Sequence, residues 1–226
     1  MKKYILLFFL LLTGFTISAQ REYIPKVYIG GKAGAIMSKI SFTPEVKQSM
    51  QNGGMAGITF RYTEEKHVGL IAEINIEQRG WNEDFEELDL KYSRSLTYIQ
   101  IPLMTHIYFG GDKFKGFINL GPEVGYLISD NIESDFDYKN PSSVPGLSSS
   151  YRETEQLNTE IKNKFDYGIS AGIGIEYFFK RKHSVNLEGR FYYGLGNIYP
   201  DSKRDTFAAS RSMSIMMTLG YSFRIK

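Results

Sequence analysis

The sequence predicts an eight-stranded antiparallel up-and-down transmembrane β-barrel, and three observations lead to this fold class. Apolar and polar residues alternate at every second position over about eight segments, which is typical of strands with one apolar and one polar face. The connections between these segments alternate between short and long. The 226 residues are 42% hydrophobic, yet their mean hydropathy of −0.27 is too low for a bundle of membrane-spanning helices.

The N-terminal segment has the pattern of a secretory signal peptide. Lys2 and Lys3 precede an apolar run over 4–16, and small residues follow it. We therefore expect a cleaved signal peptide at 1–19 and a mature barrel domain at 20–226. A membrane anchor is the alternative, although the run is shorter than the roughly 18 residues that span a bilayer. The chain has no cysteine, which excludes a lipoprotein anchor and disulfide bonds.

Four strands are expected in the first half of the chain. Glycines such as Gly30 and Gly57 in the first two fit a tightly curved barrel. In the third, apolar residues from Val68 onward alternate with polar residues that end at Arg79. Pro102 lies in the fourth and lacks an N–H for the ladder, so a bulge or a local break is expected there. These strands cover 26–38, 54–63, 67–79 and 93–109.

Four more strands follow in the second half. Pro122 raises the same expectation of a bulge or break in the fifth. The sixth alternates apolar residues from Phe165 to Tyr177 with small or acidic ones, and the seventh follows a tight turn. The eighth presents apolar residues at every second position from Met213 to Ile225. These strands cover 114–128, 163–179, 183–195 and 211–225.

The alternation of short and long connections indicates which end of the barrel faces which side. With an even number of strands, all short turns fall at one end and all long loops at the other. Outer-membrane barrels have short periplasmic turns and longer extracellular loops. We therefore expect extracellular long loops, with the short turns and both mature termini in the periplasm. The short turns are 64–66, 110–113 and 180–182, and the long loops are 39–53, 80–92, 129–162 and 196–210. The 129–162 loop is expected to be a mobile surface segment in which 154–162 could form a short helix.

Strand alternation alone does not separate a membrane barrel from a soluble lipocalin-like barrel with an apolar interior. Two observations favour lipid on the outside. The apolar stripe from Met213 to Ile225 covers roughly 30 Å along the barrel axis once strand tilt is included, which matches a hydrocarbon layer. Aromatic residues gather at the strand ends, where two interfacial belts are expected. The belts are expected to include Trp81, Tyr126, Tyr193, Tyr221, Phe223, Tyr28 and Tyr108.

An outward apolar face places a polar set in the lumen. Because the interior of an eight-stranded barrel is just wide enough for its own side chains, the charges there should pair across it. The whole chain carries 27 basic and 25 acidic residues, so neither sign dominates. We expect a closed barrel with a salt-bridged interior. The expected lumen ionic network comprises Lys32, Arg61, Glu73, Glu77, Arg79, Glu123, Asp166, Glu176, Glu188, Arg190 and Arg224.

The sequence offers no catalytic, cofactor or metal site. His67 and His183 are interpreted as turn residues and His106 as a lumen residue. All three lie toward the short turns, away from the rim where an enzyme acting on outer-leaflet lipid would need its base. No histidines stand at metal-ligand spacing. The balanced charge gives no field that attracts nucleic acid.

Several ordered motifs resemble the PorT-type outer-membrane β-barrel family of Bacteroidota. They are LTYIQIPL at 96–103, GPEVGY at 121–126, KFDYG at 164–168, YYGL at 192–195 and LGYSF at 219–223. Both strand prolines belong to these motifs. Gln100 departs from the family, in which many members carry a glutamate at this position.

The resemblance implies a porin-like outer-membrane barrel without catalytic residues. The family's namesake is an accessory of the type IX secretion system, and 80–83 with 92–103 is closer to that branch than to generic members. The expected function is therefore a non-enzymatic barrel that assists protein secretion or envelope assembly. Its expected partners are outer-membrane lipid and secretion-machinery or periplasmic proteins, and not nucleic acid. The alternative is a narrow channel or small-ligand-binding barrel gated by the 129–162 loop.

Overall fold

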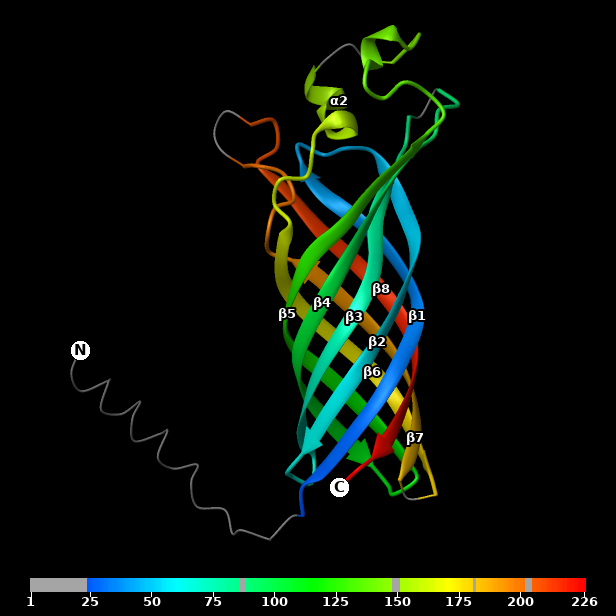
Figure 1. The fold of residues 1–226 in the computed structure, drawn as a ribbon, viewed down its shortest axis with the longest axis vertical. Coiled ribbons are helices and arrows are strands. Elements are labelled where there is room, and N and C mark those ends of the chain that lie inside the picture. Colours follow the sequence, from blue (N-terminus) through cyan, green and yellow to red (C-terminus); the bar gives the residue numbers. More distant parts are fainter. Residues whose placement is uncertain (1–23, 86–87, 148–150, 181, 202–204) are drawn as a thin grey trace, which may run out of the picture.

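The computed structural model describes residues 24–85, 88–147, 151–180, 182–201 and 205–226. The predicted signal peptide at 1–19 lies outside these residues and stays a prediction. Eight strands pair antiparallel with their neighbours in chain order, and β8 pairs with β1 to close the ring (Figure 1). The predicted fold class is confirmed. The strands are β1 (Lys26–Thr43), β2 (Gln48–Thr63), β3 (Val68–Glu83), β4 (Tyr92–Gly110), β5 (Phe114–Ser134), β6 (Phe165–Phe179), β7 (His183–Gly194) and β8 (Ala209–Arg224).

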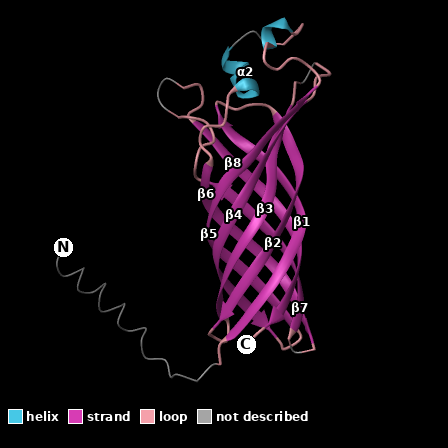
Figure 2. Cartoon of the chain, viewed as in Figure 1, coloured by secondary structure: helices cyan, strands magenta, loops and turns pink. Residues whose placement is uncertain are grey.

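The two ends of the barrel differ in their connections. The three tight turns lie at one end, together with the start of β1 and the end of β8, and we call this the turn end (Figure 1). There the backbone N–H of Val27 donates to the carbonyl of Lys226 at 3.1 Å. The other four connections lie at the opposite end, the loop end, together with the helices (Figure 2).

The helices belong to the connection between β5 and β6. They are a 3-10 helix, η2 (Pro141–Ser143), and an α-helix, α2 (Tyr151–Asn158). A short helix was predicted over 154–162, and α2 begins and ends a few residues earlier. Neither helix in the described part of the chain is long and apolar enough to span a membrane.

Several strands extend farther toward the loop end than the sequence predicts. β1 continues to Thr43 and β2 begins at Gln48, so the long loop predicted over 39–53 is wrong, and only 44–47 connect the two strands. β5 likewise continues to Ser134. The prediction followed the outward apolar stripe, whereas backbone pairing continues beyond it. In the β2–β3 ladder this extension includes a register shift between Met50 and Met55.

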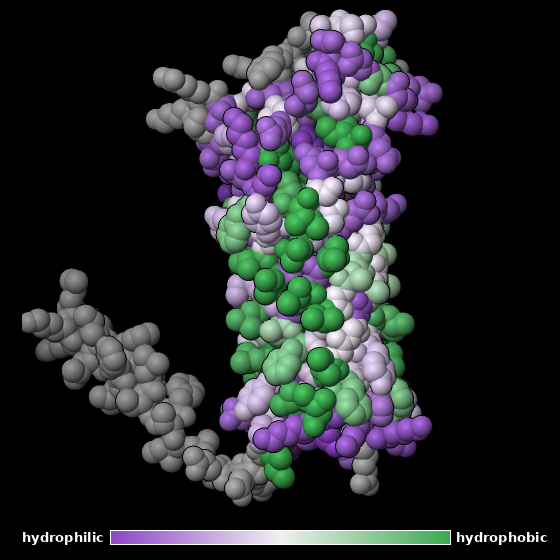
Figure 3. All heavy atoms as spheres, in the orientation of Figure 1, coloured by the Kyte–Doolittle hydropathy of each residue, from purple (hydrophilic) through white to green (hydrophobic). Residues whose placement is uncertain are grey.

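The outward face of the barrel carries an apolar band. Ile58, Leu103 and Leu219 are 54–61% exposed although they are large apolar residues. Figure 3 shows this band between two hydrophilic ends on the face in view. Toward the loop end it stops where β3 reaches Gln78 and β4 reaches Thr97. An apolar belt of this kind on a closed barrel is the surface that contacts lipid.

The outward aromatic residues flank this band, with three corrections. Trp81 is completely buried, and Tyr28 and Tyr108 are 5% exposed, so the prediction that they face lipid is wrong. The physical reason for Trp81 is the strand period, since it lies two residues after the inward Arg79 and therefore on the same face. Tyr126, Tyr193, Tyr221 and Phe223 lie on the outer face, exposed or half-buried.

Pro102 and Pro122 sit in continuous strands without a bulge beside them. Between β4 and β5 the pairing runs through Pro102 and Glu123 and resumes in the same register at Thr105 and Leu120. The missing prolyl N–H therefore interrupts the ladder locally and leaves its register unchanged. The register shift in this ladder lies elsewhere, between Thr97 and Tyr98.

A charge placed in the middle of the apolar band should destabilise the barrel strongly. Ile173 of β6 is 66% exposed on this face, and Ile173→Arg should cost about 2–4 kcal/mol because the guanidinium would enter hydrocarbon. Asn131→Arg on β5, beyond the band, is the matched control and should change stability little. Denaturant unfolding in lipid vesicles measures both free energies, and equal costs would contradict the membrane placement of the band.

Candidate functional site

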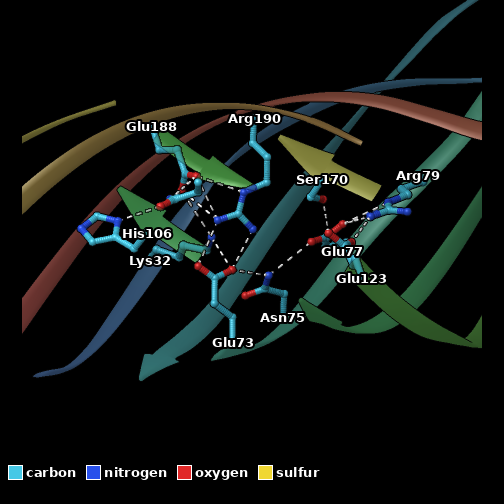
Figure 4. A network of polar contacts seen from close by, with 11 residues as sticks. Lys32, Glu73, Asn75, Glu77, Arg79, His106, Glu123, Ser170, Glu188 and Arg190 are labelled. Atoms are coloured by element: carbon cyan, nitrogen blue, oxygen red, sulfur yellow. Dashed lines mark hydrogen bonds and ion pairs between the residues drawn. The ribbon is translucent and has the colours of Figure 1, made fainter. Parts of the chain in front are cut away.

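The barrel interior holds a central ion cluster contributed by β1, β3 and β7 (Figure 4). Arg190 donates two hydrogen bonds to Glu73, at 2.8 and 3.0 Å. The same guanidinium lies 2.9 Å from Glu188. The ammonium of Lys32 lies 2.6 Å from Glu73 and 3.7 Å from Glu188. Two bases and two acids from facing walls thus neutralise each other across the lumen.

A second cluster lies on the loop side of the first and is centred on Arg79. Its guanidinium lies 2.5 Å from Glu77, 2.7 Å from Glu123 and 3.5 Å from Asp166. Arg79 also stacks on the ring of Tyr192, at 4.0 Å from the ring centroid. This cluster joins β3 to β5, β6 and β7.

Asn75 connects the two clusters. Its amide donates to Glu73 at 3.0 Å and to Glu77 at 3.4 Å (Figure 4). Uncharged side chains also donate hydrogen bonds to carboxylates of the network. Ser170 donates to Glu123, and the hydroxyl of Tyr192 donates to Asp166 at 2.8 Å.

The turn end of the lumen is closed by a third group. Arg61 of β2 donates to both oxygens of Glu176 on β6, at 2.8 and 2.7 Å. Ser184 donates to the same carboxylate at 2.6 Å, and Tyr28 lies under the guanidinium at 4.3 Å. This geometry is bidentate, which is the strongest form of an arginine–carboxylate pair.

The structure brings together all of the predicted lumen charges except one. Arg224 is half-buried at the turn end, and no ion pair is found for it among the residues that the structure describes. The prediction that it joins the network is wrong because β8 ends at this residue, where water replaces the lumen as its surroundings. The buried members comprise four bases, Lys32, Arg61, Arg79 and Arg190, and six acids, Glu73, Glu77, Glu123, Asp166, Glu176 and Glu188.

Little free volume remains between these side chains. The central void lined by Lys32, Glu73 and His106 measures about 20 Å³, and a second one near Tyr28 measures about 10 Å³. A volume of this size holds about one water molecule. The interior is therefore filled by its own polar side chains.

The loop end of the lumen differs from the middle, because a cluster of apolar side chains fills it. Leu157 and Ile161 of the β5–β6 connection and Tyr199 and Phe207 of the β7–β8 connection pack on inward residues of the strands. We call this cluster the cap. Its buried members are Ile40, Phe42, Trp81, Tyr92, Leu96, Tyr98, Leu127, Leu157, Ile161, Ile198, Tyr199 and Phe207. The 129–162 connection thus contributes packed residues, where a mobile surface loop was expected.

Arg94 fixes the cap to the barrel. It donates to both oxygens of Asp130, at 2.9 and 2.6 Å. It also donates to the carbonyl of Thr159 at 2.8 Å and to the hydroxyl of Tyr199 at 2.9 Å. One guanidinium thus connects β4 and β5 with the β5–β6 and β7–β8 connections. Arg94 was not among the predicted site residues, and its only signal in the sequence is an inward charge beyond the apolar band.

Glu83 is a half-buried acid at the edge of the cap. The indole N–H of Trp81 donates to its carboxylate at 2.8 Å. Burial raises the pKa of the Glu83 carboxyl from 4.5 to about 7, and the bond from Trp81 opposes this rise. Glu83 therefore changes charge near neutral pH, in contact with the cap.

The three histidines have contacts that fit the roles predicted for them. His106 is buried, and its Nδ1 lies 2.7 Å from the Asn119 side-chain oxygen. His67 is exposed beside a turn, and the Nδ1 of His183 lies 2.6 Å from the Tyr221 hydroxyl. In the described part of the chain, acids and histidines form no group that could hold a metal ion.

Comparisons with known proteins agree with this architecture. Residues 18–199 match the family model for the outer membrane protein β-barrel domain. The outer membrane protein OprG from Pseudomonas aeruginosa is 11% identical with a TM-score of 0.53, and the match covers 90% of this chain and 97% of that one. Neisserial surface protein A is 11% identical with a TM-score of 0.48, covering 87% and 96%. At these identities the similarity concerns the fold. A comparison with curated protein sequences gave no match.

Breaking one lumen ion pair should cost more than removing both partners. Arg61→Met leaves Glu176 buried without its base, and we expect a loss of about 3–5 kcal/mol. The double variant Arg61→Met with Glu176→Met removes the unpaired charge and should recover most of that loss. Urea unfolding in vesicles measures the three stabilities. A single variant as stable as the wild type would contradict the ion-pair role.

Neutral Glu83 should stabilise the cap at low pH. The pKa of Glu83 is about 7 in the folded protein and 4.5 in the unfolded chain. Its contribution to the free energy of unfolding is therefore fully present below about pH 4.5 and is lost as the pH rises through 7. Trp81 is the only tryptophan of the sequence, so its fluorescence reports on this contact. We expect a fluorescence transition near pH 7 that Glu83→Gln abolishes. A transition that persists in Glu83→Gln would assign it to another group.

Proposed function

The chain belongs to the outer membrane protein β-barrel domain family, and from this premise we propose that it is a non-enzymatic accessory of protein secretion or envelope assembly. In this proposal the barrel anchors the protein in the outer membrane. Its loop end, facing the cell exterior, and its turn end, in the periplasm, present surfaces to other proteins. A cleaved signal peptide at 1–19 delivers the chain to the periplasm.

The observation that carries this proposal is the filled interior. Arg190 and Arg79 hold carboxylates from other strands of the wall, and the remaining central void of about 20 Å³ has room for about one water. A pore that selects ions would more naturally line its lumen with one sign of charge. A barrel closed in this way acts through its surfaces and its anchorage in the membrane.

The cap supports the same proposal. The loop end is packed by Trp81, Leu157 and Tyr199 and fixed by Arg94, so it offers a preformed surface. Rigid surfaces bind partners without the entropic cost of ordering a loop. The resemblance to the PorT-type family favours the type IX secretion system as the process in which such a surface is used.

The alternative of a narrow channel or ligand-binding barrel would require the cap to open. In this alternative the 129–162 connection is the gate, and its residues Leu157 and Ile161 are packed in the cap. Opening would have to remove them and also separate the ion clusters below. The accessory function needs neither change, and for this reason we favour it.

Deletion of the gene should impair export of surface proteins and leave uptake of small solutes unchanged. The double variant Arg61→Met with Glu176→Met should restore export, because the accessory function does not use the lumen charges. Proteome analysis of the cell surface measures export. In planar bilayers the purified barrel should show no stable conductance. A stable, large conductance, or a deletion strain that changes only solute uptake, would favour the channel instead.

Crosslinking in intact outer membranes addresses the partner. A pull-down should recover components of the secretion machinery together with the barrel. Recovery of the barrel alone would count against the secretion role.

A further inference from the structure

One arc of the outer wall, formed by β6, β7, β8 and β1, carries cations at the edge of the apolar band. Lys162 and Lys164 lie just before β6, and Arg211 lies on the outer face of β8. Lys39 of β1 is opposite Met213 of β8, next to Arg211. On β2, β3 and β4 the outward residues at the limit of the band are uncharged. They are Asn52, Gln78 and Thr97.

Three cations of this arc line a recess on the outer wall. It measures about 720 Å³ and is lined by Lys162, Lys164 and Arg211 together with outward aromatic rings. Its one acid, Asp201, accepts a hydrogen bond from Asn197 at 2.8 Å. Among the described residues, no ion pair holds any of these three cations. The recess therefore carries an uncompensated positive charge.

The strand pattern places the recess at the level of lipid headgroups. Arg211 shares the outer face of β8 with Met213 and Ile215, and so it stands directly beyond the apolar stripe. Lys164 immediately precedes Phe165, which is 58% exposed. Aromatic rings and cations at this level contact the interface between hydrocarbon and headgroups.

The same strands carry an apolar hollow in the band itself. Its outward floor consists of the small residues Ala35, Ala171 and Gly189, with Met217 among the larger residues around it. The hollow measures about 800 Å³. Arg211 and Ile215, which lines the hollow, are four residues apart, or roughly 13 Å along the strand. The recess and the hollow are thus stacked along one wall.

We propose that this wall binds one phosphorylated glycolipid of the surrounding leaflet, with a phosphate among Lys162, Lys164 and Arg211 and an acyl chain in the hollow. Phosphate oxygens accept several charge-assisted hydrogen bonds at once, which suits a cluster of cations better than a carboxylate does. The hollow requires that the anion carry hydrocarbon, so a free phosphate or a soluble polyanion would use only half of the site. The choice of a glycolipid rests on the extracellular orientation of the loop end proposed above, since that leaflet is the one built from phosphorylated glycolipid.

Native mass spectrometry of the mature protein in detergent tests the headgroup part. The probe is diphosphorylated lipid A, compared with its dephosphorylated form and with phosphatidylglycerol. Lys162→Gln with Lys164→Gln should weaken lipid A binding by about tenfold or more. Lys91→Gln with Lys139→Gln removes the same charge from exposed positions at the same end and is the matched control, expected to bind like the wild type.

A substitution at Gly189 tests the hollow separately from the headgroup part. A Cβ at Gly189 would meet no atom within 4 Å, so Gly189→Leu can fill the hollow without disturbing the strand. It should weaken lipid A binding by a similar factor. Gly31→Leu is the control, because Gly31 also faces outward and its Cβ would meet only one backbone oxygen at 3.6 Å.

Three results would overturn the proposal. They are equal weakening by both lysine pairs, equal binding of the dephosphorylated lipid, and tighter binding of phosphatidylglycerol than of lipid A. Because the protein is in detergent, the measurement does not depend on its orientation in the cell. If the secretion role fails, the lipid-binding result is unaffected. If lipid binding fails, the proposed secretion role is unaffected, so the two failures can be distinguished.

Discussion

A ring of eight strands has room inside for its own side chains and almost nothing else. Every charge that the strand period turns inward must therefore find its partner on another wall, because water cannot solvate it there. Arg190 of β7 meets this condition with Glu73 of β3, and Arg79 of β3 meets it with Glu123 of β5. Strand register depends on these contacts, since a slip of one residue in β7 would turn Arg190 toward lipid and Phe191 into the lumen.

Much of this arrangement could be predicted from the sequence because a period of two is simple to follow. The inward positions of β3, from Glu73 to Arg79, were assigned correctly from alternation alone. Their partners could not be assigned. Which wall Arg61 faces depends on the stagger between strands, and its bond to Glu176 joins residues that are 115 positions apart. No local pattern contains that distance.

Several of the errors share one cause, which is a change of surroundings along the barrel. Inside the membrane the outer face is apolar and the lumen is polar. Beyond the band the outer face contacts water. There inward residues such as Phe42 and Trp81 form an apolar core. Trp81 was predicted to face lipid and the 39–53 segment to be a loop because the membrane rule was applied beyond the membrane. The contacts of Arg94 with the β5–β6 and β7–β8 connections were also not predicted, since they depend on how these connections fold over the barrel end.

The distribution of the lumen charges over the strands affects how the barrel can enter the bilayer. Lys32 on β1 pairs with Glu73 on β3, and Arg61 on β2 pairs with Glu176 on β6, so neither pair joins strands that are neighbours in the sheet. A sheet that is only partly inserted would expose these groups to hydrocarbon before their partners arrive. Such an intermediate is costly, because an isolated charge in lipid has nothing to neutralise it. The wall must therefore curl and close before or while it crosses the membrane, and assembly in the bilayer becomes an all-or-none event.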